Sequence, residues 1–139
     1  MRTYAPASLS VTVLFLALAV AAPGQAQTPA EGKALFQRRC GTCHSVEPGL
    51  NMAGPTLSGV VGRKVATVPG AFYSKAMKAH GGTWTLERLD VYLADPQTVV
   101  PGTSMTFALP DVAERKTILA FLEAASSPKS APKKKAAAH

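Results

Sequence analysis

The stretch RRCGTCHSV, residues 38–46, contains both cysteines of this 139-residue chain, three positions apart, with a histidine directly after the second. Two thiols at this spacing have three chemical interpretations: a redox-active dithiol, half of a zinc site, or covalent attachment of a haem. The rest of the chain decides between them.

The N-terminal segment is predicted to be a signal peptide. An apolar run, VTVLFLALAVAA (11–22), follows Arg2. It is shorter than the roughly 20 residues that span a bilayer, and the small residues after it favour cleavage after Ala26. An uncleaved membrane anchor is the alternative. We therefore expect residues 1–26 to direct export to the periplasm and residues 27–125 to form one domain.

The positive charge of the chain lies mainly in its tail. The net charge is +7, but residues 27–125 hold ten Lys/Arg against eight Asp/Glu, and residues 126–139 add four lysines. This Lys/Ala/Pro-rich tail is expected to be disordered. A solvated tail is the preferred interpretation, with weak contact to a membrane surface as the alternative. Nucleic-acid binding is not expected, because the body lacks a basic stripe.

Two helices are predicted from capping and apolar spacing. The first covers residues 29 to about 39, where Thr28 can cap the helix and Glu31 can complete a capping box. The second runs from about residue 85 to 94, with leucines at helical spacing, and stops at an Asp-Pro pair.

A third helix is predicted from Asp111, with Glu114 as a second capping box, to about Ala125. Between the helices, residues 45–72 and 95–110 are rich in Gly and Pro and show no strand alternation. The prediction is an all-α domain whose long loops wrap a large prosthetic group.

This context favours haem for the cysteine pair. A thioredoxin-type dithiol opens a helix after a strand, whereas this pair ends a predicted helix in a chain without predicted strands. A zinc site lacks its remaining ligands, because His80 and His139 are remote and isolated. In C-x-x-C-H, Cys40 and Cys43 can add to the two haem vinyl groups while His44 reaches the iron.

With this motif in place, the chain resembles the class I cytochromes c, the small, soluble monohaem proteins of bacteria and mitochondria. The resemblance covers residues 32 to about 125. Its motifs follow in order: GKALF at Gly32, CGTCH at Cys40, GPTL at Gly54, Gly62-Arg63, FYS at Phe72, GTW at Gly82, Tyr92-Leu93, VPGTSM at Val100 and ILAFL at Ile118. It implies the small cytochrome c fold, with three main helices and long loops around one covalently attached haem c.

The resemblance also implies roles for individual residues. Met105, which ends PGTSM, matches the second axial ligand of the haem iron. A thioether is soft and neutral and favours ferrous iron. The other matched positions contact the haem or its ligands: Pro55 through a carbonyl that accepts the His44 N–H, Arg63, Tyr73 and Trp84 at a propionate, Thr103 at the inner propionate, Tyr92 as donor to the methionine sulfur, and Phe107 shielding the exposed haem edge. Without the resemblance, Trp84 and Tyr92 would be core aromatics and Arg63 a surface charge.

Three positions depart from the family pattern. Met77 replaces an asparagine near a propionate, Ser104 replaces a lysine beside the methionine, and Thr56 replaces a frequent asparagine. Lys33, Arg38, Arg39, Lys75 and Lys78 remain as basic residues, but the body carries only about two net positive charges. Electrostatic docking onto acidic partners is therefore plausible but expected to be weaker than in many members of the family.

The expected function is one-electron transfer by a monomer that is not an enzyme. The resemblance implies a quinol-oxidising cytochrome bc complex as donor and a terminal oxidase or photosynthetic reaction centre as acceptor. One alternative is a haem-based small-ligand binder or peroxidase-like protein with a displaceable Met105. Another is a thiol oxidoreductase without haem.

Overall fold

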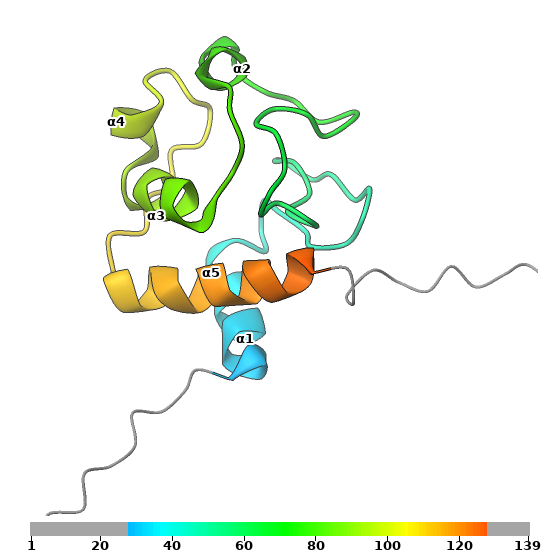
Figure 1. Cartoon of the computed structure of the whole chain (residues 1–139), viewed down its shortest axis with the longest axis vertical. Helices are drawn as coiled ribbons and strands as arrows, with labels where there is room; N and C mark the ends of the chain where they lie inside the picture. Colours follow the sequence, from blue (N-terminus) through cyan, green and yellow to red (C-terminus); the bar gives the residue numbers. More distant parts are fainter. Residues whose placement is uncertain (1–27, 128–139) are drawn as a thin grey trace, which may run out of the picture.

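The computed structural model describes residues 28–127, which form an all-α domain. The predicted signal peptide, and the predicted tail from residue 128 on, lie outside the described residues. Five helices follow one another (Figure 1): α1 (Pro29–Arg39), α2 (Lys75–His80), α3 (Leu86–Ala94), α4 (Pro96–Val99) and α5 (Val112–Ser126). Extended pairing in this part of the chain is confined to one isolated bridge between Lys64 and Thr83. The predicted fold class is confirmed.

The three predicted helices are present with nearly the predicted bounds. At the start of α1, the amide of Glu31 donates to Oγ1 of Thr28 at 3.3 Å, and the Thr28 amide donates to the Glu31 carboxylate at 2.7 Å. This is the predicted capping box. It satisfies donors at the first turn that have no partner within the helix.

The second predicted capping box, at the start of α5, is only half formed. Asp111 accepts the amide of Glu114 at 2.8 Å, as expected. The Glu114 carboxylate instead accepts two hydrogen bonds from one edge of the Arg39 guanidinium, from Nε to Oε2 at 3.0 Å and from Nη2 to Oε1 at 2.7 Å. A guanidinium offers a carboxylate two parallel hydrogen bonds, so the pair ties the end of α1 to the start of α5.

Two short helices were not predicted. Asp95, which ends α3, also caps α4, because its Oδ1 accepts the amide of Thr98 at 3.1 Å and Pro96 occupies the first turn. Ser74 caps α2 by accepting the amide of Met77 at 3.0 Å. Helices of four and six residues are too short to carry a recognisable apolar period.

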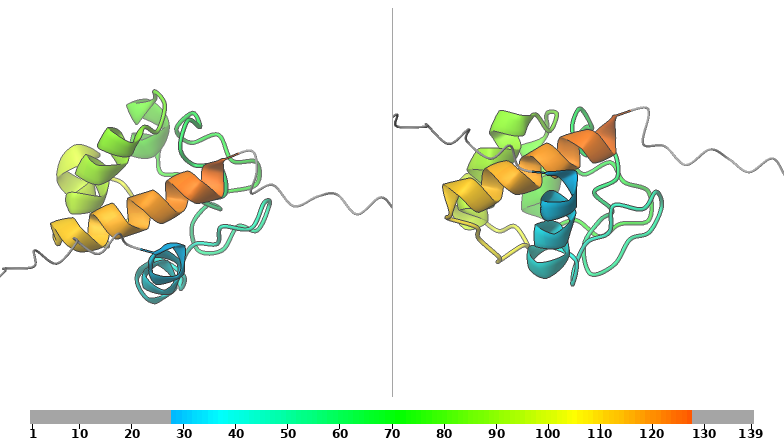
Figure 2. Two further views of the ribbon diagram at one scale, coloured as in Figure 1. Left: turned by 60° about the horizontal axis from the view of Figure 1, so that its bottom comes forward. Right: turned by 90° about the horizontal axis from the view of Figure 1, so that it is seen from below.

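Helix α1 crosses α5 at close range, as both views of Figure 2 show. A Cβ atom at Gly32 would lie 2.8 Å from Cβ of Phe121, so only glycine fits at the crossing. Beside it, the rings of Phe36 and Phe121 pack with centroids 5.4 Å apart. Such aromatic pairs stabilise a core beyond the area that they bury.

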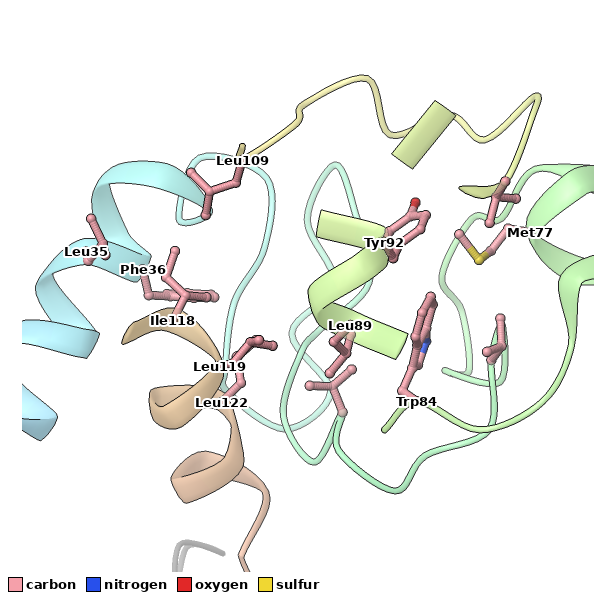
Figure 3. Packing of buried hydrophobic residues seen from close by; sticks show 13 residues of the cluster. Leu35, Phe36, Met77, Trp84, Leu89, Tyr92, Leu109, Ile118, Leu119 and Leu122 are labelled. Atoms are coloured by element: carbon pink, nitrogen blue, oxygen red, sulfur yellow. The ribbon is translucent and has the colours of Figure 1, made fainter. Parts of the chain in front are cut away.

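The buried residues divide between two sides of α5. Figure 3 shows Leu35, Phe36 and Ile118 where α1 meets α5, and a second group farther along. That group contains Met77, Trp84, Leu89 and Tyr92. Within residues 28–127, no helix combines the length and the apolar character needed to cross a membrane.

Candidate functional site

The C-x-x-C-H motif forms a tight turn directly after α1. The amide of Cys40 donates to the carbonyl of Phe36 at 2.7 Å, which continues the helical pattern past Arg39. The amides of Cys43 and His44 then both donate to the carbonyl of Cys40, at 3.0 and 2.9 Å. Both thiols are free. The turn therefore keeps two thiols and one imidazole together, and burial raises the pKa of the Cys40 thiol to about 11.

The imidazole of His44 is fixed by one hydrogen bond. Its Nδ1 lies 2.7 Å from the carbonyl oxygen of Pro55, and because a carbonyl only accepts, Nδ1 carries the proton. Burial lowers the pKa of His44, and the Pro55 bond offsets part of that effect. A neutral imidazole protonated on Nδ1 has its free lone pair on Nε2, the arrangement that a metal-binding histidine needs.

Gly54 makes room for this imidazole. A Cβ atom at Gly54 would lie 2.8 Å from both ring nitrogens of His44 and would collide with Cε1 between them. The Gly54 amide also donates to the carbonyl of Cys43 at 2.8 Å. The sequence analysis used Gly54 only as part of the GPTL motif and did not identify it as a site residue.

One cavity of about 470 Å³ lies next to the motif, and every predicted site residue lines it. The residues come from the motif turn, the Gly/Pro-rich loops and α3: Cys40, Cys43, His44, Pro55, Arg63, Tyr73, Trp84, Tyr92, Thr103, Met105 and Phe107. Their individual roles toward a haem stay predictions. The lining also contains Leu57, Leu89 and Leu93, which the resemblance implied as apolar wall, and it adds Val60, Met77 and Leu122.

Arg63 places a cation in the cavity wall. Its Nη1 donates to the carbonyl of Ser58 at 2.7 Å, and its Nη2 donates to that of Thr56 at 2.9 Å. Partial burial lowers the pKa of the guanidinium, although not enough to discharge it. A fixed, partly desolvated cation in an apolar cavity is suited to a ligand that carries a carboxylate.

The hydrogen bond from Tyr92 to the sulfur of Met105, which the resemblance implies, stays a prediction. In the structure the Tyr92 hydroxyl lies 2.9 Å from Oγ1 of Thr103. That same oxygen accepts the amide of Met105 at 3.3 Å. Thr103 therefore links the Tyr92 hydroxyl to the backbone of Met105. Burial raises the pKa of the Tyr92 phenol, which stays protonated and able to donate.

Gln97 was missed by the sequence analysis. Its side-chain amide on α4 donates to two carbonyls of the loop, that of Thr103 at 3.0 Å and that of Met105 at 3.1 Å. The sequence gives no signal for this role, because a single glutamine in a short polar stretch resembles any exposed residue. Figure 1 shows α4 lying beside this loop.

Arg115 holds the far end of the same loop. It is 7% exposed. Its Nε donates to Asp90 on α3 at 2.8 Å, and its Nη1 donates to the carbonyls of Leu109 and Pro110 at 2.9 and 2.7 Å. The loop that carries Met105 is thus tied to α4 by Gln97 and to α3 and α5 by Arg115.

These residues fit a covalently attached haem. The cavity offers two free thiols, a neutral imidazole with Nε2 available, and a thioether on another segment of its wall. Its remaining wall is mostly apolar, and the Arg63 guanidinium lies in this wall. The fold and the site together define a small c-type haem protein.

Comparison with known proteins agrees with this class. Residues 29–126 match the family model described as cytochrome c, and the chain belongs to the cytochrome c family. Members of this family are electron-transfer proteins, not enzymes, with one covalently bound haem c, and Cys40 and Cys43 stand in the C-x-x-C-H position.

Individual relatives support the assignment. The chain is 50% identical over 92 residues to a cytochrome c-type cyt cy of Rhodobacter capsulatus, a match that covers 66% of this chain and 46% of that relative. It is 45% identical over 96 residues to a cytochrome c2 of Blastochloris viridis, covering 68% and 75%. The solved structure of cytochrome c2 from Rhodospirillum centenum superposes with a TM-score of 0.66 at 37% identity, covering 71% of this chain and 98% of that one.

Proposed function

We propose that this protein carries single electrons in the periplasm, with His44 and Met105 as the two axial ligands of its haem iron. The observation that carries the proposal is the pairing of these side chains in one cavity: His44 is oriented by Pro55 with Nε2 free, and Met105 lines the same cavity. The bound haem supplies a one-electron ferrous/ferric couple.

The residues around the two ligands favour reversible transfer. The Pro55 carbonyl holds the His44 ring in one tautomer, and Gly54 leaves space for that ring alone. Hydrogen bonds from Gln97 hold the backbone at Met105. Ligands held in this way need little rearrangement when the iron changes charge, and two retained ligands leave no position for an external molecule.

The cavity wall supports the same function by excluding water. Buried apolar side chains, among them Val60, Leu89 and Leu122, surround the space beside the motif. A low-polarity environment and a thioether ligand both disfavour the ferric charge, so they raise the reduction potential. Arg63 would balance a haem propionate at the edge of this environment.

For the partners, we propose a quinol-oxidising cytochrome bc complex as donor and a terminal oxidase or photosynthetic reaction centre as acceptor. Residues 1–26 would direct export, and the protein would act as a monomer with a solvated basic tail. These proposals are supported by the family assignment and by the apolar run near the N-terminus.

A redox titration of the holoprotein, produced by export with a cytochrome maturation system, tests the function. The expected result is a reversible one-electron couple, together with no spectral change when carbon monoxide is added to the reduced protein. Prompt binding of carbon monoxide would instead favour the small-ligand binder with a displaceable Met105. A product with titratable thiols and no haem would favour the thiol oxidoreductase.

A further inference from the structure

The cavity opens to solvent through a set of exposed lining residues, which we call the rim. These are the lining residues whose side chains are exposed: Arg39, Thr42, Cys43, Ala53, Phe72, Ser104, Thr106 and Phe107. They come from the motif turn, from the loop before α2 and from the loop that carries Met105. A molecule that exchanges electrons with a group in the cavity would contact this surface.

The rim has no free charge among its described residues. Arg39 is its one charged member, and the Arg39 guanidinium is engaged by both oxygens of Glu114 at 2.7 and 3.0 Å. Exposed cations that neighbour the rim in the sequence, Arg38 and Lys75, do not line the cavity. Where the family pattern has a lysine beside the methionine, this chain has Ser104.

Two aromatic rings stand out on the rim. Phe72 is 77% exposed and Phe107 is 42% exposed. Exposed aromatic side chains beside a cavity are typical of contact surfaces, whose central parts are enriched in aromatics and depleted in charge. Burying a phenylalanine against a partner contributes roughly 1.5–3 kcal/mol relative to exposure.

We propose that the redox partner docks on the rim through an uncharged, apolar face. An acidic face would give up the hydration of its carboxylates without gaining a free cation in return. An apolar face would bury Phe72 and Phe107 and lose no paired charge. This inference rests on the proposed electron transfer and specifies the chemistry of the partner.

Protein-film voltammetry of the holoprotein tests the docking chemistry with defined surfaces. One gold electrode carries a mixed hydroxyl- and methyl-terminated alkanethiol monolayer, and a second carries a carboxylate-terminated monolayer of the same length. We expect the electron-transfer rate per adsorbed molecule to be higher on the apolar monolayer. There it should change by less than about twofold between about 0.01 M and 1 M salt, a range over which the screening length falls from ~30 to ~3 Å.

Matched variants locate the effect on the rim. Phe72→Ser and Phe107→Ser should each lower the affinity of the protein for the apolar monolayer by about tenfold, as expected for the loss of a buried aromatic. Val91→Ser removes an exposed apolar side chain of α3 and should leave this affinity unchanged. Thr106→Lys should weaken adsorption on the apolar monolayer, whereas Ala120→Lys, the same charge change at an exposed position of α5, should not.

Two results would overturn the proposal. A rate that is highest on the carboxylate monolayer and collapses with salt would indicate an acidic partner. A concentration-dependent dimer in sedimentation equilibrium, abolished by Phe72→Ser, would mean that the rim binds a second copy of this chain. The proposed function fails separately, if the holoprotein gives no reversible couple in a solution titration.

Discussion

Tyr92 and Thr103 are joined by a hydrogen bond of 2.9 Å between their hydroxyl groups, which links helix α3 to the loop that carries Met105. Because Thr103 also accepts the amide of Met105, the position of this methionine depends on a buried phenol two elements away. Gln97 and Arg115 hold the same loop from α4 and α5. The loop that carries Met105 is therefore held by hydrogen bonds from three helices, although it has no regular secondary structure.

Replacing Tyr92 with phenylalanine tests the hydrogen bond between Tyr92 and Thr103. Tyr92→Phe should lower the free energy of unfolding by about 1–2 kcal/mol, because the buried hydroxyl of Thr103 loses one of its two hydrogen-bond partners. Guanidinium unfolding at neutral pH measures this loss, and an unchanged unfolding midpoint would contradict it.

The same variant has a predicted pH signature. Burial raises the pKa of Tyr92 in the folded state, so the folded protein keeps this proton when an unfolded tyrosine, with a pKa of ~10, has lost it. Folding stability from this group is therefore complete below the unfolded pKa and falls as pH rises above it. The stability gap between wild type and Tyr92→Phe should narrow above that pH.

Gln97 should be a positioning residue for Met105. Gln97→Ala and Gln97→Glu both remove the donated hydrogen bonds, and each should lower the unfolding free energy by about 1–2 kcal/mol. In both variants imidazole should bind the oxidised haem more readily than in wild type, a change that a purely structural role elsewhere would not produce. Gln37→Ala, at an exposed position of α1, is the control. If imidazole binds all three variants equally, Gln97 has no part in holding Met105.

Breaking the ion pair between Arg115 and Asp90 should lower the free energy of unfolding more when Arg115 is replaced than when Asp90 is replaced. Arg115→Met leaves two carbonyls and Asp90 without their donor and should cost about 3 kcal/mol, near the low end for a buried pair. The Asp90 side chain is 40% exposed, so Asp90→Asn should cost about 1 kcal/mol. A double-mutant cycle by denaturant unfolding checks both values. Equal losses of unfolding free energy in the two single variants would argue against the role of Arg115 in holding the loop.

Gly54 should be required for the correct position of His44. Gly54→Ala would bring a methyl group into the imidazole, so we expect a severalfold lower yield of holoprotein and a haem spectrum of altered ligation. Gly59→Asn is the matched control, because Gly59 has φ +65°, which asparagine tolerates, and no atom lies within 4 Å of its Cβ position. Normal holoprotein from Gly54→Ala would show that the ring has space to move.

Whether an interaction could be predicted from the sequence depends on how far apart its two residues lie along the chain. The capping box at Thr28 and Glu31 was predictable because both partners lie within one turn. The partner of Glu114 was not, since Arg39 lies 75 residues away. Resemblance placed residues such as Arg63 on one cavity. It gave no indication of the hydrogen bond between Tyr92 and Thr103, because a hydrogen-bond partner depends on side-chain geometry and not on position in a motif.

The central claim is that His44 and Met105 both bind the haem iron, and the absorption spectrum of the oxidised holoprotein tests it most directly. Met77 is the rival thioether, because it is buried and lines the same cavity. We predict a weak far-red sulfur-to-iron band in wild type and in Met77→Leu, and its loss in Met105→Ala with the haem still attached. A band that survives in Met105→Ala, or that is absent from wild type, would contradict the assignment.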